Sequence, residues 1–306
     1  MASTETIRPR VFIDGEHGTT GLQIRERLAP RDDIDLLEIA FEERRDAAVR
    51  ERLLRAADFA ILCLPDDASR EAASMVEGHG TRLIDASTAH RTHRDWVFGF
   101  AELTRGQRER IAAAKRVANP GCYSTGAIAL IRPLTESATL PRDARLTINA
   151  VSGYTGGGKA LIAEMESGAV EAGYFAYATG LSHKHLPEIR EYGRLDNAPI
   201  FTPAVGPFAQ GMAVNIPLHL EPLGLTRERL HEALSAHYAD GGTVEVAPLG
   251  NVERIDPTVL NGTDRMRLHV FGNDERANLV AVLDNLGKGA SGACVQSLDI
   301  MIAGAR

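Results

Sequence analysis

The stretch Val11–Leu28, VFIDGEHGTTGLQIRERL, decides the fold class of this chain. A short β-rich run leads into a turn with glycines at every third position, and apolar residues at helical spacing follow. Glycines at such a junction permit a tight turn and close approach to a pyrophosphate, while the helix N-terminus favours anions. Glycine turns are common, but this one opens a series of strands and helices, which favours a dinucleotide site. The residues predicted to hold the dinucleotide are Gly15, Gly18, Thr19, Thr20 and Gly21.

The first 120 residues alternate β-rich runs with helical patterns, as a parallel sheet with crossover helices requires. The predicted strands are Arg10–Gly15, Ile34–Ala40, Phe59–Pro65, Thr81–Ser87 and Lys115–Gly121. The pieces between them place apolar residues at helical spacing. The sequence therefore predicts an α/β fold with a Rossmann-type parallel-sheet domain over residues 1–119.

The sequence pattern changes after Pro120. A long apolar-periodic stretch from Cys122 predicts a helix, and strand-like runs follow it. The predicted strands there are Arg145–Tyr154, Met212–Leu220, Thr243–Leu249, Met266–Asn273 and Ala277–Asn285. Thr226–Asp240 is the one clear helix among them, which favours an α+β domain with a mixed sheet over residues 120–285. The closing stretch, Gly289–Gly304, is predicted to be helical.

Composition limits the classes of protein and partner. The 306 residues, 44% of them hydrophobic, predict two domains. A net charge of −7 with dispersed arginines predicts no nucleic-acid partner. No apolar run approaches the roughly 20 residues of a membrane span, and the start, MASTETIRPR, lacks the apolar core of a signal peptide. We therefore expect a cytoplasmic protein with no membrane partner.

The three cysteines are widely separated, at positions 63, 122 and 294, which predicts neither a disulfide nor a zinc site. Cys122 follows Asn119-Pro120-Gly121 at a predicted strand-to-helix turn. A helix N-terminus stabilises a thiolate, and ligands bind at this edge of parallel sheets. Free cysteines are usually small buried core residues, and that interpretation suits Cys63 and Cys294. Cys122 is therefore the predicted nucleophile.

A thiolate mechanism also needs a group that moves protons near neutral pH, and histidine is suited to this role. His183 and His185 form a strand-like HxH segment, whose alternation would place both rings on one face. Surface exposure is the alternative for each histidine. Half of a metal site is another, but no further cluster completes it, so no metal is predicted.

Anion contacts are less specific in the sequence. Cationic candidates for a phosphate are Lys159, Lys184 and Arg91, each of which could equally be solvated. Ser124 and Thr125 are candidates for helix capping or phosphate contact. The predicted second strand runs into Glu42-Glu43-Arg44-Arg45, so the pattern admits either NAD or the 2′-phosphate of NADP.

Six segments together resemble one family. GEHGTTGLQI, DASTAHR, FGFAEL, NPGCYSTGAI, SHKHLPEI and DNLGKGASGACVQ occur in the order and spacing of the N-acetyl-γ-glutamyl-phosphate reductase family, in its shorter bacterial form. The resemblance covers essentially the whole chain. It implies an NADP-binding Rossmann domain completed by a C-terminal helix at residues 286–306. It also implies a glyceraldehyde-phosphate-dehydrogenase-like catalytic and dimerisation domain, and NADPH-dependent formation of N-acetylglutamate 5-semialdehyde in arginine biosynthesis.

The resemblance also implies roles for particular residues. Cys122 would be the nucleophile that carries a thioacyl intermediate, and His185 the acid/base. Substrate contacts are expected at His183, Asn119, Ser124 and Lys159. Cofactor contacts outside the glycine turn are expected at Arg44, Ser87, Lys288 and Gly289. We further expect a small-molecule substrate and a homo-oligomer, dimer or tetramer, with the long mixed sheet as its interface.

Three alternatives remain at this point. The glycine turn alone also suits an aspartate-semialdehyde dehydrogenase or an ordinary hydroxy-acid dehydrogenase. A non-catalytic nucleotide-sensing protein could use the same fold, but it would need neither Cys122 nor His185. Which of His183 and His185 moves the proton stays open.

Overall fold

The computed structural model describes residues 8–305, which divide between two compact units. The first unit comprises the chain up to Gly99, Glu109–Asn119 and the chain from Cys294, and the second comprises Phe100–Arg108 and Pro120–Ala293. Most of the segment predicted to lack a signal peptide, and the last residue of the predicted terminal helix, lie outside the described residues. Within residues 8–305, no helix is long and apolar enough to cross a bilayer.

The unit boundaries differ from the predicted domains at two places. Phe100–Arg108 and residues 286–293 belong to the second unit, whereas the sequence places them in the first domain. A side-chain contact accounts for both, since Glu102 pairs with Lys288 at 2.6 Å and accepts a hydrogen bond from Thr243. Each of these three residues lies in the second unit.

The first unit is built on a parallel sheet. Its strands are β1 (Arg10–Asp14), β2 (Asp35–Leu37), β3 (Phe59–Leu62), β4 (Arg82–Asp85), β5 (Val97–Phe98) and β6 (Arg116–Ala118). Their order is β2-β1-β3-β4-β6-β5, and every pair is parallel. The predicted Rossmann-type sheet is therefore confirmed. The two-residue strand β5 has no counterpart in the prediction, because a run that short has no periodicity to detect.

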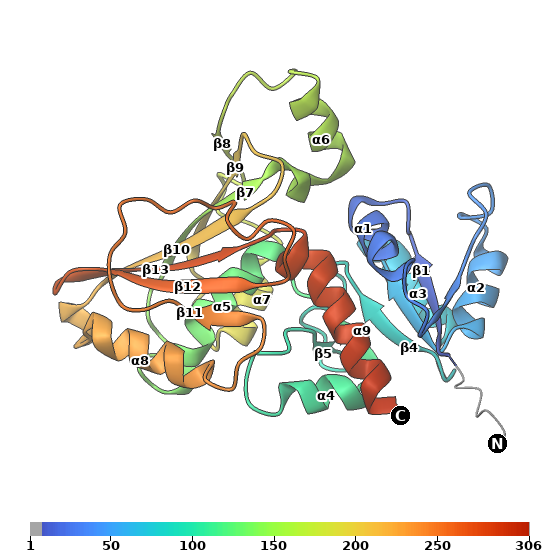
Figure 1. The fold of residues 1–306 in the computed structure, drawn as a ribbon, viewed down its shortest axis with the longest axis horizontal. Helices are drawn as coiled ribbons and strands as arrows, with labels where there is room; N and C mark the ends of the chain where they lie inside the picture. The colour runs from blue at the N-terminus through green and yellow to red at the C-terminus, as the bar shows by residue number, and fades with distance from the viewer. Residues whose placement is uncertain (1–7, 306) are drawn as a thin grey trace. The chain divides into compact units, whose positions relative to one another are not determined.

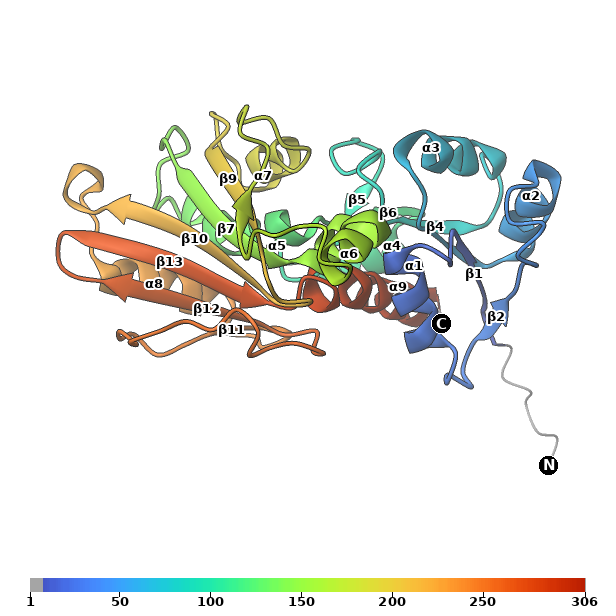
Figure 2. The same ribbon diagram turned by 90° about the horizontal axis from the view of Figure 1, so that it is seen from above.

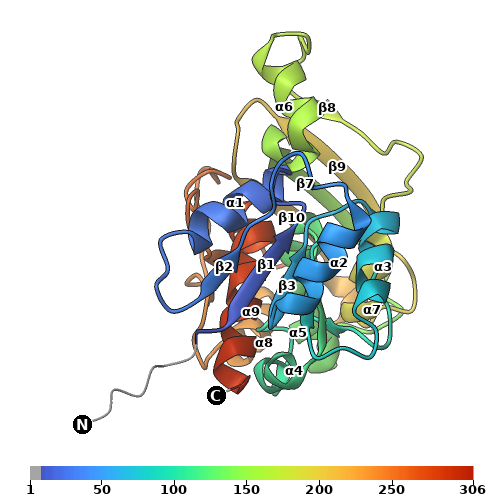
Figure 3. The same cartoon turned by 90° about the vertical axis from the view of Figure 1, so that its right-hand side faces the viewer.

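Helices cover both faces of this parallel sheet. They are α1 (Thr19–Leu28), α2 (Ala47–Ala56), α3 (Asp66–Met75), α4 (Gln107–Ala113) and α9 (Gly292–Ala305), of which α4 and α9 each begin in the second unit. Figures 2 and 3 show α2 and α3 on one face, with α1 and α9 on the other. Phe12 and Leu83 from the strands pack with Leu54 of α2 in one buried cluster. The terminal helix is held by hydrogen bonds such as that from Arg82 Nη1 to the Met301 carbonyl.

The second unit is built on a mixed sheet. Its strands are β7 (Thr147–Gly153), β8 (Phe175–Ala176), β9 (Ile200–Gly206), β10 (Met212–His219), β11 (Val244–Val246), β12 (Met266–Gly272) and β13 (Arg276–Leu283). The order is β11-β12-β13-β10-β7-β9-β8, with β7–β9 and β11–β12 parallel and the other pairs antiparallel. The predicted mixed sheet is confirmed, although β8 and β9 have no counterpart in the prediction.

In the second unit, α5 (Cys122–Glu136) and α8 (Arg227–His237) pack on the sheet, and α7 (Leu186–Tyr192) packs against α5. Strand residues alternate accordingly, so that Ile148 and Ala150 are buried while Asn149 is exposed. A short helix, α6 (Gly158–Glu166), follows β7 and projects away from the sheet (Figure 1). A π-helical turn, η3 (Gly287–Ser291), connects β13 to α9.

Candidate active site

The glycine turn after β1 depends on close backbone packing. Gly15 has a φ of +91°, and a Cβ there would lie 2.4 Å from the carbonyl oxygen of Cys63. A Cβ on Gly21 would lie 2.4 Å from the carbonyl oxygen of Gly15. In the sheet, β1 is flanked by β2 on one side and by β3 on the other, so the strand order reverses at β1. Open α/β sheets bind ligands at such a topological switch point, and the glycine turn follows β1 there.

The start of α1 fits a phosphate. Gly18 precedes the helix in an extended conformation, and no side chain caps it. Thr19 and Thr20 are the first two helical residues, so they contribute N–H groups to a first turn that has no side-chain cap. This geometry agrees with the dinucleotide site predicted for the turn, since anionic phosphate oxygens accept such hydrogen bonds.

The turn after β2 holds the predicted 2′-phosphate contact. The guanidinium of Arg44 lies 3.5 Å from the ring centroid of Phe41 and donates to its carbonyl oxygen. The His17 ring, in the glycine turn, contacts the same Phe41 ring edge-on at 5.0 Å between centroids. The structure therefore brings Arg44 to the same local cluster as the glycine turn.

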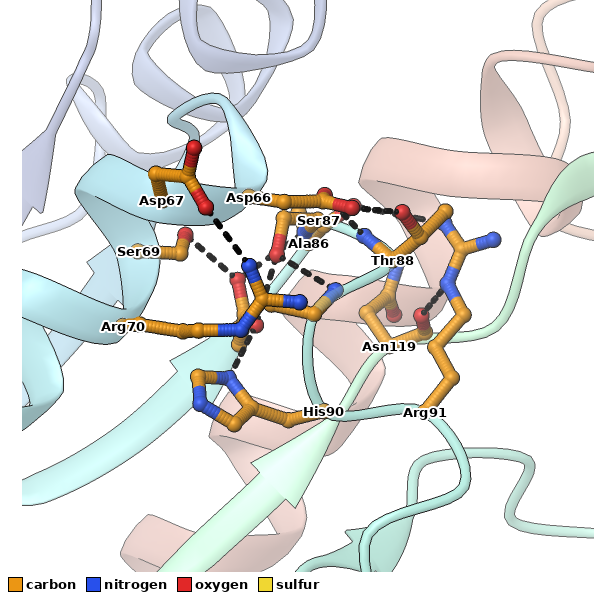
Figure 4. Close-up of polar contacts among 12 residues, drawn as sticks. Asp66, Asp67, Ser69, Arg70, Ala86, Ser87, Thr88, His90, Arg91 and Asn119 are labelled. Atoms are coloured by element: carbon orange, nitrogen blue, oxygen red, sulfur yellow. Dashed lines mark hydrogen bonds and ion pairs between the residues drawn. The ribbon is translucent and has the colours of Figure 1, made fainter. Parts of the chain in front are cut away.

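Ser87 lies just beyond the end of β4, where a buried carboxylate organises the backbone (Figure 4). Asp85 is fully buried and accepts hydrogen bonds from the Ser87 N–H at 2.9 Å and hydroxyl at 2.8 Å. It also accepts from the hydroxyl of Ser69 and contacts Nδ1 of His90 at 2.6 Å. The Ser87 hydroxyl thus bonds within the protein, and its predicted cofactor contact stays a prediction.

Asn119 directly follows β6, and the loop after β4 holds its backbone. Its N–H donates to the Asp85 carbonyl at 2.8 Å, and its carbonyl accepts from Arg91 Nε at 3.0 Å (Figure 4). Arg91 is buried and donates also to the carbonyl of Ala86. The DASTAHR segment, residues 85–91, therefore holds the backbone of Asn119, three residues before Cys122.

Cys122 begins α5, as the sequence predicts. Gly121 precedes it in an extended conformation without a side-chain cap. The hydroxyls of Ser124 and Thr125 are buried and donate to the Gly121 carbonyl at 2.8 Å each, so neither caps the helix N–H groups, and their predicted phosphate contact stays a prediction. Cys122 is half-buried. Because Cys122 is the first residue of α5, its thiol lies at a helix N-terminus, where the helix dipole favours a thiolate.

The other two cysteines are Cys63, which directly follows β3, and Cys294, which is buried in α9. Burial, with a smaller contribution from the charge of Asp85, raises the pKa of the Cys63 thiol to about 12. Burial raises the pKa of Cys294 as well. Neither thiol forms a thiolate readily near neutral pH.

The histidine segment is not a strand, which corrects the prediction. His183 lies in an irregular loop, and His185 has an α-helical backbone conformation as the residue that precedes α7. The His185 N–H donates to Nδ1 of His183 at 3.1 Å, which turns the chain back at this point. The two rings still meet, edge to face at 4.7 Å, but a turn brings them together instead of strand alternation.

Two tyrosines surround the histidines. The Tyr123 ring lies 6.0 Å from each imidazole, and the Tyr177 hydroxyl lies 3.3 Å from Nε2 of His183. Burial, and then the neighbouring Tyr177 and Cys122, raise the pKa of Tyr123; burial raises the pKa of Tyr177 to about 12, and Cys122 adds to it. Both phenols are therefore neutral at physiological pH, and the negative charge of a Cys122 thiolate would raise the pKa of each.

Glu188 is a site residue that sequence reasoning missed. Its side chain is 1% exposed, one oxygen accepts from the Gly121 N–H at 3.3 Å, and the other lies 4.0 Å from Nε2 of His185. It therefore links the segment before Cys122 to the start of α7. The signal was present in the Leu-Pro-Glu that follows His185, since an acidic residue in a helix's first turn has a favourable charge for that position.

The remaining predicted contacts lie in different environments. Lys159 is exposed on α6, and Lys184 is exposed between the two histidines. Lys288 is buried and pairs with Glu102, while a Cβ on its neighbour Gly289 would lie 2.9 Å from Cβ of Cys122. The structure thus places Gly289 against Cys122 and directs the Lys288 ammonium to Glu102. Among residues 8–305, no group of three or more His, Cys, Asp or Glu side chains could hold a metal ion.

Comparisons with known proteins agree with this architecture. The family described as semialdehyde dehydrogenase, NAD binding domain, matches residues 10–114, and the semialdehyde dehydrogenase dimerisation domain matches residues 122–285. The chain belongs to the semialdehyde dehydrogenase family of oxidoreductases. The structure of aspartate semialdehyde dehydrogenase II from Vibrio cholerae, complexed with ASA, is similar in fold, with a TM-score of 0.74 at 16% identity over 97% of this chain and 99% of that one. The enzyme from Candida albicans, with NADP, gives a TM-score of 0.67 at 13% identity over 97% and 99% of the chains.

Curated relatives define the branch of this family. N-acetyl-gamma-glutamyl-phosphate reductase from Brucella anthropi is 57% identical, covering 97% of this chain and 99% of the relative. The protein of the same name from Brucella suis is 56% identical over the same shares. Within the semialdehyde dehydrogenase family, the chain's place is among the N-acetyl-gamma-glutamyl-phosphate reductases, and the resemblance seen in the sequence is confirmed.

Proposed function

We propose that this protein reduces N-acetyl-γ-glutamyl phosphate to N-acetylglutamate 5-semialdehyde with NADPH, a cytoplasmic step of arginine biosynthesis. The relatives at 56–57% identity carry the name of this activity. The observation that carries the mechanism is a cysteine at an uncapped helix N-terminus, near a pair of contacting histidines. A free thiol nucleophile also suits a reducing compartment.

Cys122 would perform the first chemical step. Its thiolate attacks the acyl carbon, a C–S bond forms, and the bond from that carbon to the phosphate oxygen breaks, so that inorganic phosphate leaves. The oxygen of the tetrahedral intermediate becomes negative, and the uncapped N–H groups at the start of α5 are donors suited to it. The product of this step is a thioester on Cys122.

The first unit would hold the cofactor. Its first helix offers N–H groups from Thr19 and Thr20 to the pyrophosphate, and Gly15 and Gly21 permit close backbone packing there. When bound, the cofactor supplies a hydride to the thioester carbon. Arg44 supports NADP over NAD, because its guanidinium stands beside the glycine turn and could pair with a 2′-phosphate. The Candida albicans relative, described with NADP, supports the same choice.

The contacts favour His185 over His183 as the proton carrier. Nδ1 of His183 accepts the backbone N–H of His185, so this nitrogen carries no proton, and a neutral His183 keeps its proton on Nε2 toward Tyr177. Protonating His183 would break the backbone hydrogen bond. Glu188 lies 4.0 Å from Nε2 of His185 and can orient that ring. His185 would thus protonate the thiohemiacetal oxygen and take the proton back as the C–S bond breaks, which releases the aldehyde and the Cys122 thiolate.

A homo-oligomer is part of the proposal, because the second unit matches a family domain described as a dimerisation domain. We infer that a second copy docks on the face of the mixed sheet opposite α5 and α8. Asn149, Thr202 and Asn215 lie opposite one another in register there, and the Asn149 amide oxygen accepts from the Thr202 hydroxyl at 2.6 Å. Asn149→Arg, with Thr202→Arg as a second variant, should convert a dimer or tetramer to monomers in light scattering. Unchanged mass in both variants would move the interface elsewhere.

The activity is tested by NADP reduction in the reverse direction with phosphate present. N-acetylglutamate 5-semialdehyde should be oxidised at least 100-fold faster, as kcat/KM, than aspartate semialdehyde, and only with phosphate. The opposite preference would assign an aspartate-semialdehyde dehydrogenase. NADPH binding without turnover of either aldehyde would indicate a nucleotide sensor. Cys122→Ser is the matched control, since it should bind NADPH and turn over neither substrate.

A further inference from the structure

The second unit contains a buried ion pair between Lys288 and Glu102. Nζ of Lys288 lies 2.6 Å from a carboxylate oxygen of Glu102, and the two side chains are only 1% and 9% exposed. The same ammonium lies 5.3 Å from the ring centroid of Phe100, within cation–π range. A buried ion pair is often no more stabilising than apolar residues of similar size, so its presence is weak evidence for a purely stabilising role.

Glu102 connects separate segments of this unit. One of its oxygens contacts Lys288, in the π-helical turn η3, and the other accepts from the Thr243 hydroxyl at 2.8 Å, just before β11. Glu102 belongs to Phe100–Arg108. This segment is part of the second unit, although the residues before and after it in the sequence belong to the first. The pair therefore connects η3 to the Phe100–Arg108 segment and to the residue before β11.

The residue after Lys288 contacts the nucleophile. A Cβ built on Gly289 would lie 2.9 Å from Cβ and 3.3 Å from Cα of Cys122, so its backbone packs directly against that residue. The Gly289 N–H donates to the Asp284 carbonyl at 2.9 Å, which fixes the other side of the turn. Single π-helical turns occur frequently at functional sites, and this one begins next to the buried lysine.

We propose that Lys288 and Glu102 are positioning residues, which hold the backbone of Gly289 against Cys122 and thereby set the direction from which its thiol attacks. This rests on the proposed function, which makes Cys122 the nucleophile. In this proposal the Lys288 ammonium binds Glu102, whereas the sequence predicts that it contacts the cofactor. Loss of the pair lets η3 shift, and a misplacement of about 1 Å at a reacting group can cost about 100-fold in rate.

The test uses three variants of the full-length protein. Lys288→Met leaves the Glu102 carboxylate buried without its partner, whereas the double variant Glu102→Gln/Lys288→Met removes both charges and should unfold at a temperature closer to that of the wild type. Gly289→Ala keeps the ion pair but places a methyl group against Cys122. All three should lower kcat about 10- to 100-fold while KM changes less than about threefold. Arg132→Met/Glu136→Gln, which removes an ion pair at the other end of α5, is the matched control and should keep kcat.

A second readout needs no substrate. The rate of Cys122 alkylation by iodoacetamide, followed from pH 6 to 9 by mass spectrometry, should change at least threefold in each of the three variants and stay at the wild-type value in the control. A folded double variant with wild-type kcat and alkylation rates would show that the pair is only structural, and so would a fully active Gly289→Ala. If the wild type fails to reduce the acyl phosphate but the alkylation rates change as expected, the proposed substrate is wrong and the positioning role stands.

Discussion

Two strand-to-helix turns, β1–α1 in the first unit and β6–α5 at the start of the second, share one local geometry. A glycine precedes each helix with nearly the same extended backbone, φ −75° and ψ 165° at Gly18 and φ −78° and ψ 155° at Gly121. Neither helix has a side-chain cap. Both turns therefore present N–H groups and the positive end of a helix dipole to whatever lies beyond the helix.

The two turns differ in the residue that begins the helix and in how its first turn is held. α1 starts with Thr19 and Thr20, which suits a phosphate supplied from outside. α5 starts with Cys122, and its following hydroxyls donate back to the Gly121 carbonyl, so that the helix end is fixed around the thiol. In the proposed function, the same polar helix end would bind a cofactor phosphate in one turn and would stabilise the Cys122 thiolate in the other.

The largest effect is expected beside Cys122. His185→Gln should lower kcat by about 10³-fold, because general acid–base catalysis contributes about 10² to 10⁴. His183→Gln should cost less, since our account makes that ring a support for the His185 backbone. Steady-state kinetics of both variants decide the assignment, and a larger loss at His183 would reverse it.

The glycine turn is broken by a single methyl group. Gly15→Ala places a Cβ 2.4 Å from the Cys63 carbonyl at a φ of +91°, so it should weaken NADPH binding at least tenfold and destabilise the fold by about 1–3 kcal/mol. Gly80→Ala is the control, because Gly80 lies outside this turn and nothing lies within 4 Å of a Cβ built there. Fluorescence titration with NADPH compares them, and equal affinities would argue against this turn as the phosphate site.

The preference for NADPH over NADH tests the role of Arg44, which lies beside the β1–α1 turn. Arg44→Ala should lower affinity for NADPH about tenfold while NADH affinity stays unchanged, since only NADPH carries the 2′-phosphate. Arg45→Ala is the neighbour control. A parallel loss of both cofactors in Arg44→Ala would assign Arg44 to packing on Phe41 instead.

The smallest effect concerns stability against pH, away from both turns. Burial, and then the charge of Arg267, lower the pKa of His269 on β12 below the usual 6.5. The unfolded chain therefore binds this proton at higher pH than the folded one, so the stability contribution is present above about pH 6.5 and is lost as the pH falls below it. His269→Gln should flatten that acid-side decline in urea unfolding, and an unchanged slope would contradict the assignment.

Much of this molecule follows from local sequence, and the limits of prediction are physical. The strand-to-helix turn before Cys122 could be predicted because Asn-Pro-Gly ends a strand and an apolar period begins at once. The two-residue strands β5 and β8 carry no period to detect. The histidine pair was placed on a strand because alternation was the only short-range pattern available, whereas a backbone hydrogen bond to the His183 ring forms the turn. Glu188 contacts Gly121 and Glu102 contacts Lys288, and because these partners are distant in sequence, the contacts themselves could not be predicted.

The central claim, that Cys122 carries the acyl group, is tested by intact-protein mass spectrometry after mixing with N-acetyl-γ-glutamyl phosphate in the absence of NADPH. The account predicts one N-acetylglutamyl adduct, mapped to Cys122 by peptide analysis and discharged when NADPH is added. Cys122→Ser should bind NADPH normally and form no thioester. Retention of most reductase turnover in Cys122→Ser, or rapid wild-type turnover with no adduct on Cys122, would contradict the account.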